Sequence, residues 1–234
     1  RRRSDLLISG IYVAILNTVI AFTLAFVDGL ETASITKFAL FGACNGFVSS
    51  VFAVGLISLG ESMLNLPTVF RLQELTDTSL PLLKELSESA MGSYIHSINV
   101  ANLAETAANA VHANGLLAKV GALYHDIGKI NNPQCFTENE TPGVKFHAEL
   151  TPKESAQEII RHVSDGLALA DKHGLPQALK DFINTHHGTT NTAYFYNKYL
   201  NDGGDPAEVS EFYYNGEKPT TKEQVILMLC DTIE

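Results

Sequence analysis

The stretch Tyr124-His125-Asp126-Ile127-Gly128-Lys129 contains a histidine-aspartate pair around which other potential metal ligands are distributed. Alone the pair is a weak signal, because a single helical histidine is more often a surface or core residue than a ligand. The order along the chain makes the signal strong. The flanking donors are His96, His162, His186, His187 and Asp231. This ordered set, H…HD…H…HH…D, supplies enough nitrogen and carboxylate donors for two metal ions.

The remaining histidines of the eight in the chain have no place in this pattern. His112 and His173 lie near the expected ends of helices, where an exposed histidine is ordinary. His147 lies between two expected helices and could approach the site, but we leave it outside the ligand set.

The donor types limit the metals. Imidazole and carboxylate together suit first-row divalent ions such as iron, manganese or zinc, and the absence of cysteine from the set disfavours a structural zinc site. His125 and Asp126 would diverge by about 100° on a helix, so each can address a different part of the site. An aspartate can bridge two ions, whereas a histidine binds one.

Two runs near the N-terminus, residues 6–27 and 38–60, contain no charged side chain. Each is long enough to cross the roughly 30 Å hydrocarbon layer as a helix. Small residues such as Gly42, Ala43, Gly46 and the pair Ser49-Ser50 suit close helix packing in lipid. The alternative is a pair of buried core helices, but two uncharged runs longer than twenty residues disfavour it. A signal peptide would be shorter and occur once. The sequence predicts two transmembrane helices.

Charge predicts their orientation. Arginines occupy residues 1–3, whereas the expected connection, residues 28–37, holds one lysine against Asp28 and Glu31. The positive-inside rule places the arginines in the cytoplasm and the connection outside. The chain then returns to the cytoplasm at Glu61.

We therefore expect three parts: two transmembrane helices in residues 1–60, a juxtamembrane connector in residues 61–92, and a cytoplasmic domain in residues 93–234. In the connector, Pro67 and Pro81 begin short segments that either couple the spans mechanically to the domain or serve as a spacer.

The domain is predicted to be all-α. Ser93 can cap a helix that holds His96, and residues 116–124 form another. The runs Thr151-Pro152-Lys153-Glu154 and Thr220-Thr221-Lys222-Glu223 are typical of helix caps. One further helix is expected to begin at Pro176 and to end at residues 186–188. No convincing run of alternating strand residues occurs.

Composition limits the classes of molecule that the chain can bind. With 234 residues, a net charge of −10 and a pI near 5.2, the chain can form one well-packed domain plus extra elements. The acidic balance argues against binding duplex DNA, although metals can still attract a small anionic substrate. Cys44, Cys135 and Cys230 suggest no disulfide framework, which suits a reducing compartment. The chain does not begin with methionine, so we expect a piece of a longer protein.

The ordered ligand set resembles that of the HD-domain metal-dependent phosphohydrolases with two metals. A closer resemblance comes from four runs: Gly92-Ser93-Tyr94-Ile95-His96-Ser97, Val100-Ala101-Asn102-Leu103-Ala104-Glu105, Tyr124 to Lys129, and His186-His187-Gly188-Thr189. They are similar to the membrane-anchored HD phosphodiesterases with a seven-helix transmembrane receptor region. The likeness covers nearly the full chain and implies an HD-domain helical bundle with a binuclear metal centre.

The resemblance implies a function. This family hydrolyses the bacterial second messenger cyclic di-AMP to the linear dinucleotide pApA, using two divalent transition-metal ions, with iron or manganese favoured. It implies an inner (cytoplasmic) membrane protein of a bacterium, with the HD domain facing the cytoplasm. The two spans would be the last of seven, and the final helix would be cut short after Asp231. The resemblance does not decide whether the protein forms a homo-oligomer.

The resemblance also implies residue roles. His96, His125 and Asp231 would bind one metal, His162, His186 and His187 the other, and Asp126 would bridge them. Lys129 would offset charge that develops on the phosphate; the alternative is a solvated lysine. Thr189 and Tyr194, with Phe195 and Tyr196, are candidates for substrate contact, although these aromatic residues suit a core equally well.

Three rival functions remain at this point. A cyclic di-GMP phosphodiesterase of the HD-GYP type is disfavoured because Gly188-Thr189-Thr190 replaces the Gly-Tyr-Pro signature. A nucleotide phosphohydrolase such as a dNTPase or a (p)ppGpp hydrolase would leave His162, His186 and His187 unused. A non-catalytic receptor domain that senses a dinucleotide would not require the complete ligand set.

Overall fold

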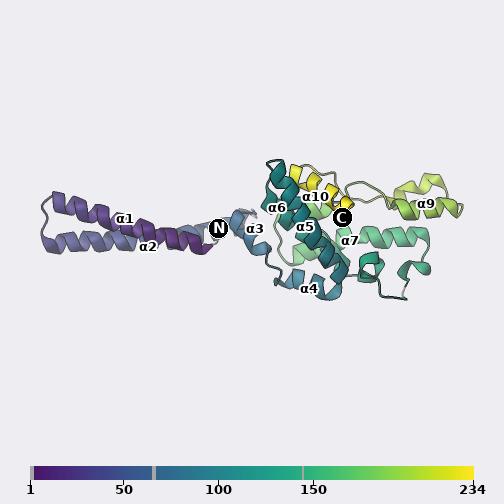
Figure 1. Cartoon of the computed structure of the whole chain (residues 1–234), viewed down its shortest axis with the longest axis horizontal. Coiled ribbons are helices and arrows are strands. Elements are labelled where there is room, and N and C mark those ends of the chain that lie inside the picture. Colours follow the sequence, from purple (N-terminus) through teal and green to yellow (C-terminus); the bar gives the residue numbers. More distant parts are fainter. Residues whose placement is uncertain (1–2, 65–66, 144) are drawn as a thin grey trace. The chain divides into compact units, whose positions relative to one another are not determined.

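The computed structural model describes residues 3–64, 67–143 and 145–234, and its regular structure is helical. Within these residues the β pairing is an isolated bridge between Asn191 and Tyr213. The chain divides into two compact units, Arg1–Gln73 and Glu74–Glu234, and Figure 1 shows helices in both. The all-α prediction is confirmed.

The first unit is a hairpin of two long helices, α1 (Arg3–Val27) and α2 (Thr32–Leu64) (Figure 1). The turn is tighter than the expected connection, because α2 begins at Thr32 and Lys37 lies inside it. Gly29 permits this turn by adopting a positive φ of 68°, which is costly for other residues. Arg1 and Arg2, two of the three arginines that precede the first predicted span, lie outside the described residues.

The two helices of the hairpin approach each other closely at glycine. A Cβ atom on Gly46 would lie 2.3 Å from the Cα of Ala14, and one on Gly10 would lie 2.2 Å from the Cβ of Ser50. Larger side chains at these positions would therefore push the helices apart, which is the packing expected of membrane helices.

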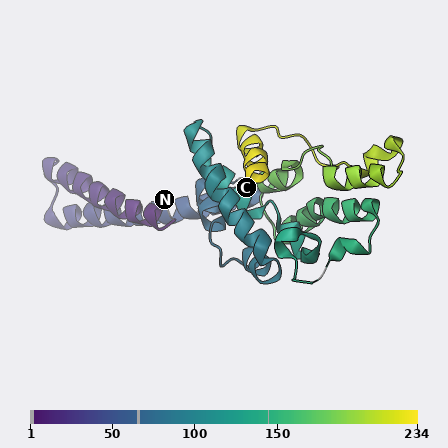
Figure 2. The same ribbon diagram turned by 45° about the vertical axis from the view of Figure 1, so that its right-hand side comes forward.

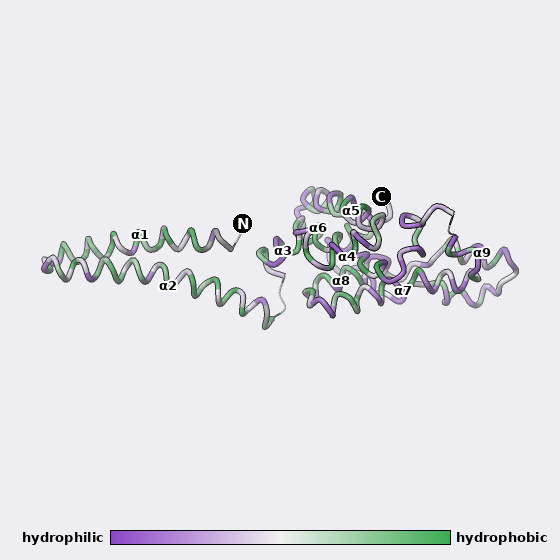
Figure 3. The backbone as a smooth tube through the Cα atoms, turned by 90° about the horizontal axis from the view of Figure 1, so that it is seen from below, coloured by the Kyte–Doolittle hydropathy of each residue, from purple (hydrophilic) through white to green (hydrophobic). Residues whose placement is uncertain are grey.

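The outer surface of the hairpin is apolar. Large side chains such as Phe41, which is 74% exposed, point away from the partner helix, and both helices are largely hydrophobic in Figure 3. The segments Leu7–Val27 and Thr32–Glu61 are long and apolar enough to cross a membrane, and only 11% and 6% of their most apolar windows are buried. Such exposure would be unfavourable in water, so the hairpin suits a lipid environment.

The second unit is built of helices that are shorter than those of the hairpin (Figures 1 and 2), and α3 crosses the boundary into it. The α-helices are α3 (Val69–Leu75), α4 (Pro81–Ser89), α5 (Met91–Ala110), α6 (Gly115–Tyr124), α7 (Pro152–Lys172), α8 (Gln177–Thr185), α9 (Ala193–Asn201) and α10 (Lys222–Ile233). The 3₁₀ turns are η1 (Ile127–Ile130), η2 (Pro133–Cys135), η3 (Thr137–Asn139), η4 (Phe146–Ala148) and η5 (Pro206–Phe212).

The core of this unit lies where α5, α6, α8 and α10 meet. The α5 and α6 helices pack along each other, α10 packs on both, and α6 also contacts α8. The α7 helix packs against η1, α8 and α9. Fully buried apolar side chains fill the centre, including Leu83, Leu86, Val120, Phe182 and Leu227. This packing places the end of α6 beside α7 and α10.

Several predicted helix boundaries are confirmed and others are corrected. Thr151 forms a complete capping box with Glu154 at the start of α7. Thr221 caps α10, but its capping-box partner is Gln224. Ser93 is not a cap: α5 begins at Met91, and the buried hydroxyl of Ser93 donates to Glu138 at 2.9 Å.

Gly128 lies in η1, beyond the end of α6 at Tyr124. A Cβ atom at this position would lie 1.8 Å from the carbonyl oxygen of His162, a distance that no side chain can occupy. Glycine therefore allows η1 to pack directly against α7. This contact brings Asp126, just before η1, next to His162.

Candidate metal centre

The predicted ligands come from helices far apart in sequence. His96 lies in α5, His162 in α7 and Asp231 in α10. The His125-Asp126 pair joins the end of α6 to η1. His186 and His187 follow α8, which ends one residue earlier than the predicted 186–188, at Thr185. The side chains most completely buried are those of His125, Asp126, His162 and His186.

The structure gathers these residues into two groups of three, each able to hold a cation. One group contains His96, His125 and Asp231, and the other contains His162, His186 and His187. Within each group the potential ligand atoms lie within 4.8 Å of one another. This grouping matches the one that the family resemblance implies.

Asp126 lies between the two groups. Its Oδ2 atom is 3.3 Å from Nε2 of His125 and 3.8 Å from Nε2 of His96. Its Oδ1 atom is 3.5 Å from Nε2 of His162 and 3.7 Å from Nε2 of His186. Each carboxylate oxygen therefore faces a different group, which is the arrangement that a bridging ligand requires.

Three of the imidazoles are held in one orientation by the backbone of their own helix. The Nδ1 atoms of His125, His162 and His186 donate to carbonyl oxygens three residues earlier, at 2.7, 2.6 and 2.8 Å. This contact fixes the tautomer and turns Nε2 toward the site, as is usual for histidines that bind metals.

The donor set fits a cation. Burial lowers the pKa of His162 and places that of His186 well below its usual range, so both rings are neutral. The Nε2 atoms of the two rings are nevertheless 3.1 Å apart. Neither atom carries a proton, because each neutral ring has its proton on Nδ1. The buried Oδ1 of Asp126 also accepts no hydrogen bond. These groups would be costly to bury without a positive partner, so the residues suit divalent metal binding.

The two groups differ in charge. Burial lowers the pKa of His187 to about 3, and the neighbouring His162 adds to this effect. Burial also acts on His125, but the carboxylates of Asp126 and Asp231 outweigh it and raise the pKa of the imidazole to about 10. A metal that binds beside His125 must therefore displace a proton.

His96 has additional contacts at the edge of the site. Its Nε2 lies 2.9 Å from Oδ1 of Asp231, and its Nδ1 contacts the carboxylate of Glu234. The amide of Asn99 donates to the other oxygen of Glu234 at 2.8 Å. A carboxylate on the far nitrogen is a common way to orient a metal-bound histidine.

Lys129 is part of the centre and is not a solvated surface residue. Its ammonium group lies 2.7 Å from Oδ2 of Asp126 and 2.8 Å from Oε1 of Glu138, and its side chain is only 12% exposed. It also lies over the ring of Phe136, 4.7 Å from the centroid. Burial opposes the charge, but Asp126 and Glu138 outweigh it and raise the pKa of Lys129 above its usual range. The lysine therefore stays charged.

The predicted substrate contacts lie on the surface. Thr189 is exposed just after the histidine doublet, and Tyr194 at the start of α9 is 72% exposed. Tyr196 is half-buried, and Phe195 is buried in a cluster with Ala156 and Phe212. Phe195 is thus a core residue, whereas Tyr194 is free to meet a ligand.

His147, which we left outside the ligand set, lies in neither group of donors. Its Nε2 lies 2.9 Å from the carbonyl oxygen of Cys135, and its ring contacts Phe195 at a centroid distance of 4.9 Å. In the described structure this histidine is therefore a packing residue.

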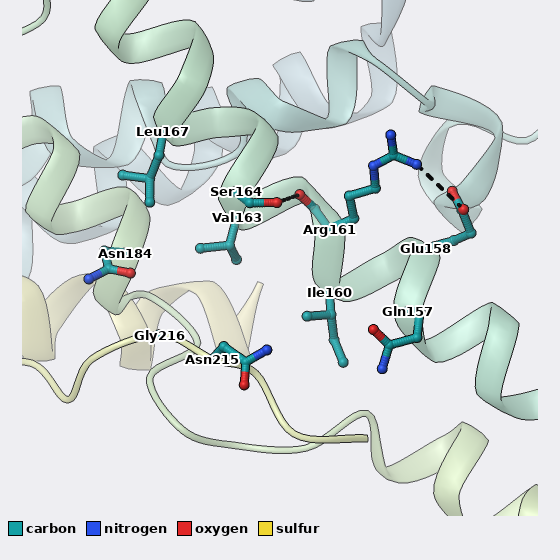
Figure 4. Close-up of a pocket in the computed structure, with 10 residues that line it drawn as sticks. All are labelled: Gln157, Glu158, Ile160, Arg161, Val163, Ser164, Leu167, Asn184, Asn215 and Gly216. Carbon is teal, nitrogen blue, oxygen red and sulfur yellow. Dashed lines mark hydrogen bonds and ion pairs between the residues drawn. The ribbon is translucent and has the colours of Figure 1, made fainter. Parts of the chain in front are cut away.

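A pocket of about 410 Å³ lies beside α7 and contains none of the predicted ligands (Figure 4). Ile160, Val163 and Leu167 form its apolar side, and Asn184, Asn215 and Gly216 lie opposite. Arg161 and Glu158 pair at its rim, at 3.7 Å. The two candidate ligand groups therefore do not line this pocket.

Sequence reasoning did not find several residues that contact the centre, among them Glu138 and Tyr214. Glu138 pairs with Lys129, and Tyr214 stacks on His187 at a centroid distance of 4.3 Å. Both lie in connecting segments with no helical periodicity, and neither is a typical metal ligand at a diagnostic spacing. Only the folded arrangement reveals them.

Comparisons with known proteins identify the family to which the chain is similar. A family model described as HD domain matches residues 93–234, and one described as 7TM receptor with intracellular HD hydrolase matches residues 1–68. The chain is 39% identical over 234 residues to the cyclic-di-AMP phosphodiesterase PgpH of Bacillus subtilis (strain 168), and 37% identical over 235 residues to PgpH of Listeria monocytogenes serotype 1/2a (strain 10403S). These matches cover 99% and 100% of the chain but 33% of each relative, so the chain spans about a third of their length.

A solved structure is also similar. The crystal structure of the L. monocytogenes PgpH HD domain in complex with cyclic-di-AMP superposes with a TM-score of 0.64 at 40% identity, covering 67% of this chain and 73% of that one.

Proposed function

Because this chain belongs to the HD-domain family, we propose that it is a metal-dependent phosphodiesterase that hydrolyses cyclic di-AMP to linear pApA. The observation that carries the proposal is the position of Asp126 between two groups of three ligands, with one carboxylate oxygen toward each. Such a site suits the hydrolysis of a phosphodiester. The substrate follows from the relatives, which are named for this activity.

In the proposed centre, His96, His125 and Asp231 hold one divalent ion, and His162, His186 and His187 hold the other. Asp126 serves both. When bound, the two ions would supply Lewis-acid activation of the phosphodiester and of the attacking water. The mixture of imidazole and carboxylate donors, with no cysteine in either group, suits first-row divalent ions. Among these we propose iron or manganese, which the family resemblance favours.

The protein's own side chains contribute orientation and charge. Backbone carbonyls hold the Nδ1 protons of His125, His162 and His186, which leaves each Nε2 available as a ligand. Lys129 is held beside Asp126 by Glu138, so its positive charge is already in place before a phosphate arrives. We propose Asp126 and Lys129 as the catalytic residues, with Lys129, Thr189 and Tyr194 contacting substrate.

The hairpin supports a membrane location. The match to the receptor family covers residues 1–68, and both helices are apolar enough to span a bilayer. We propose that the enzyme resides in the bacterial cytoplasmic membrane, that residues 61–92 connect the spans to the HD domain, and that the domain faces the cytoplasm. A reducing compartment suits the free cysteines.

The test is metal analysis and turnover on the same detergent-solubilised chain. We expect about two transition-metal ions per chain. We also expect cleavage of cyclic di-AMP that is much faster than that of cyclic di-GMP, with pApA accumulating before AMP. Equal rates on both cyclic dinucleotides would reject the specificity for cyclic di-AMP but would still support phosphodiesterase activity. Two bound ions without any turnover would favour a non-catalytic sensor.

A further inference from the structure

His187 differs from the other histidines of its group in how it is held. His162 and His186 each donate Nδ1–H to a backbone carbonyl. The Nδ1 atom of His187 has a carboxylate oxygen of Asp231 as a neighbour, but at 3.9 Å. That distance is too long for a hydrogen bond. The orientation of this imidazole must therefore come from packing.

The packing partner is Tyr214. Its ring is nearly parallel to that of His187, with an interplanar angle of 27° and a centroid distance of 4.3 Å. The ring of His186 also contacts His187, at 4.1 Å and 42°, and that of His162 meets it edge-on at 86°. Rotating the His187 ring would bring its edge against the tyrosine face. The tyrosine ring thus restricts the imidazole to one plane.

Tyr214 is itself fixed in place. Its backbone N–H donates to the carbonyl oxygen of Thr190 at 2.8 Å, just beyond the histidine doublet. Its side chain is only 8% exposed and packs in a cluster with Ile160 and Val163 of α7. The segment that carries it therefore cannot move without disturbing α7, which also carries His162.

We propose that Tyr214 is a positioning residue that orients His187 through the face of its ring and so completes the second metal group. The inference rests on the proposed two-metal function. The hydroxyl is not required, because the ring face makes the contact. Loss of a contact that orients a metal ligand typically costs 10- to 100-fold in affinity.

Metal titration tests this directly. The probe is Mn²⁺ added to the metal-free, detergent-solubilised chain, followed by calorimetry and elemental analysis. We expect Tyr214→Phe to bind two ions as the wild-type chain does. We expect Tyr214→Leu, which keeps apolar volume but loses the ring, to weaken one site about 10- to 100-fold and to leave the other unchanged. Tyr213→Leu is the matched control, because the neighbouring Tyr213 is 39% exposed.

A double-mutant cycle shows which site is affected. If Tyr214 acts through His187, Tyr214→Leu should add little to the effect of His187→Ala, because the contact is already absent. Full additivity would overturn the proposal, as would wild-type affinity at both sites in Tyr214→Leu. Equal weakening of both sites, or a comparable loss in Tyr214→Phe, would also overturn it. A wild-type chain that binds fewer than two ions would instead reject the proposed metal centre.

Discussion

The Nε2 atoms of His162 and His186 lie 3.1 Å apart in the interior, while the Nδ1 atoms of both rings donate to backbone carbonyls. Two lone pairs thus point at each other where neither ring can supply a proton. Pure apolar packing would not select this contact, because it leaves both acceptors unsatisfied. A cation beside the pair would remove this penalty, which supports the proposed role of the two histidines as metal ligands.

The first prediction concerns the ligands. His162→Ala or His187→Ala should lower the metal content from about two ions toward one and abolish hydrolysis, because each removes a donor from the second group. Asp126→Ala should lose both ions, since its two oxygens face different groups. Elemental analysis of the purified variants decides this. Full activity in either histidine variant would reject the two-metal assignment.

Lys129 should affect the rate and not the metal content. An ammonium group cannot bind a cation, so Lys129→Ala should retain about two ions while turnover falls on the order of 10²- to 10³-fold. Lys119→Ala is the matched control, because Lys119 also forms an ion pair, with Glu105 at 2.6 Å, away from the ligand groups. Single-turnover hydrolysis and metal analysis on one preparation would measure both effects. A rate within a few-fold of wild type would return Lys129 to a structural role.

Gly128 should be intolerant of a side chain. Gly128→Ala places a Cβ 1.8 Å from the backbone of His162, so η1 must move away from α7 and take Asp126 with it. We expect lower metal affinity and a lower unfolding temperature. In Gly166→Ala, by contrast, the new Cβ would meet the side chain of Ile183 at 3.0 Å, and that side chain can shift. We expect thermal unfolding to show a smaller loss of stability in Gly166→Ala than in Gly128→Ala.

The metal-free chain should lose stability in acid. Burial lowers the pKa of His187 to about 3 and also lowers those of His162 and His186. As pH falls below about 6.5, these histidines take up protons in the unfolded chain but stay neutral in the folded chain. The free energy of unfolding therefore falls. Denaturant titrations from pH 7 to pH 4 should show this decline. His187→Gln should show a shallower one, and an identical slope would contradict the assignment.

The effect of His125 falls in a different pH range. Its folded pKa is raised to about 10, so its ion pairs with Asp126 and Asp231 contribute fully below about pH 6.5 and are lost as pH rises through 10. The metal-free chain should therefore also lose stability toward alkaline pH, and the same titrations extended to pH 10 would show it.

Much about this protein follows from local sequence. The long uncharged runs predict the two apolar helices, since helix length and hydrophobicity are properties of a continuous segment. The Thr151 cap follows from residues that meet their partners within one turn. The ordered histidines and aspartates indicate the metal chemistry, because few other residue types bind divalent ions in this way.

Only the tertiary structure shows the contacts between residues that are distant in sequence. The assignment of Ser93 as a cap was wrong because its partner, Glu138, lies 45 residues later. The role of Gly128 depends on the backbone of α7, and the contact between Tyr214 and His187 depends on how residues 190 and 214 pair. Periodicity and spacing describe neighbours along one helix, whereas these contacts arise only when separate helices pack together.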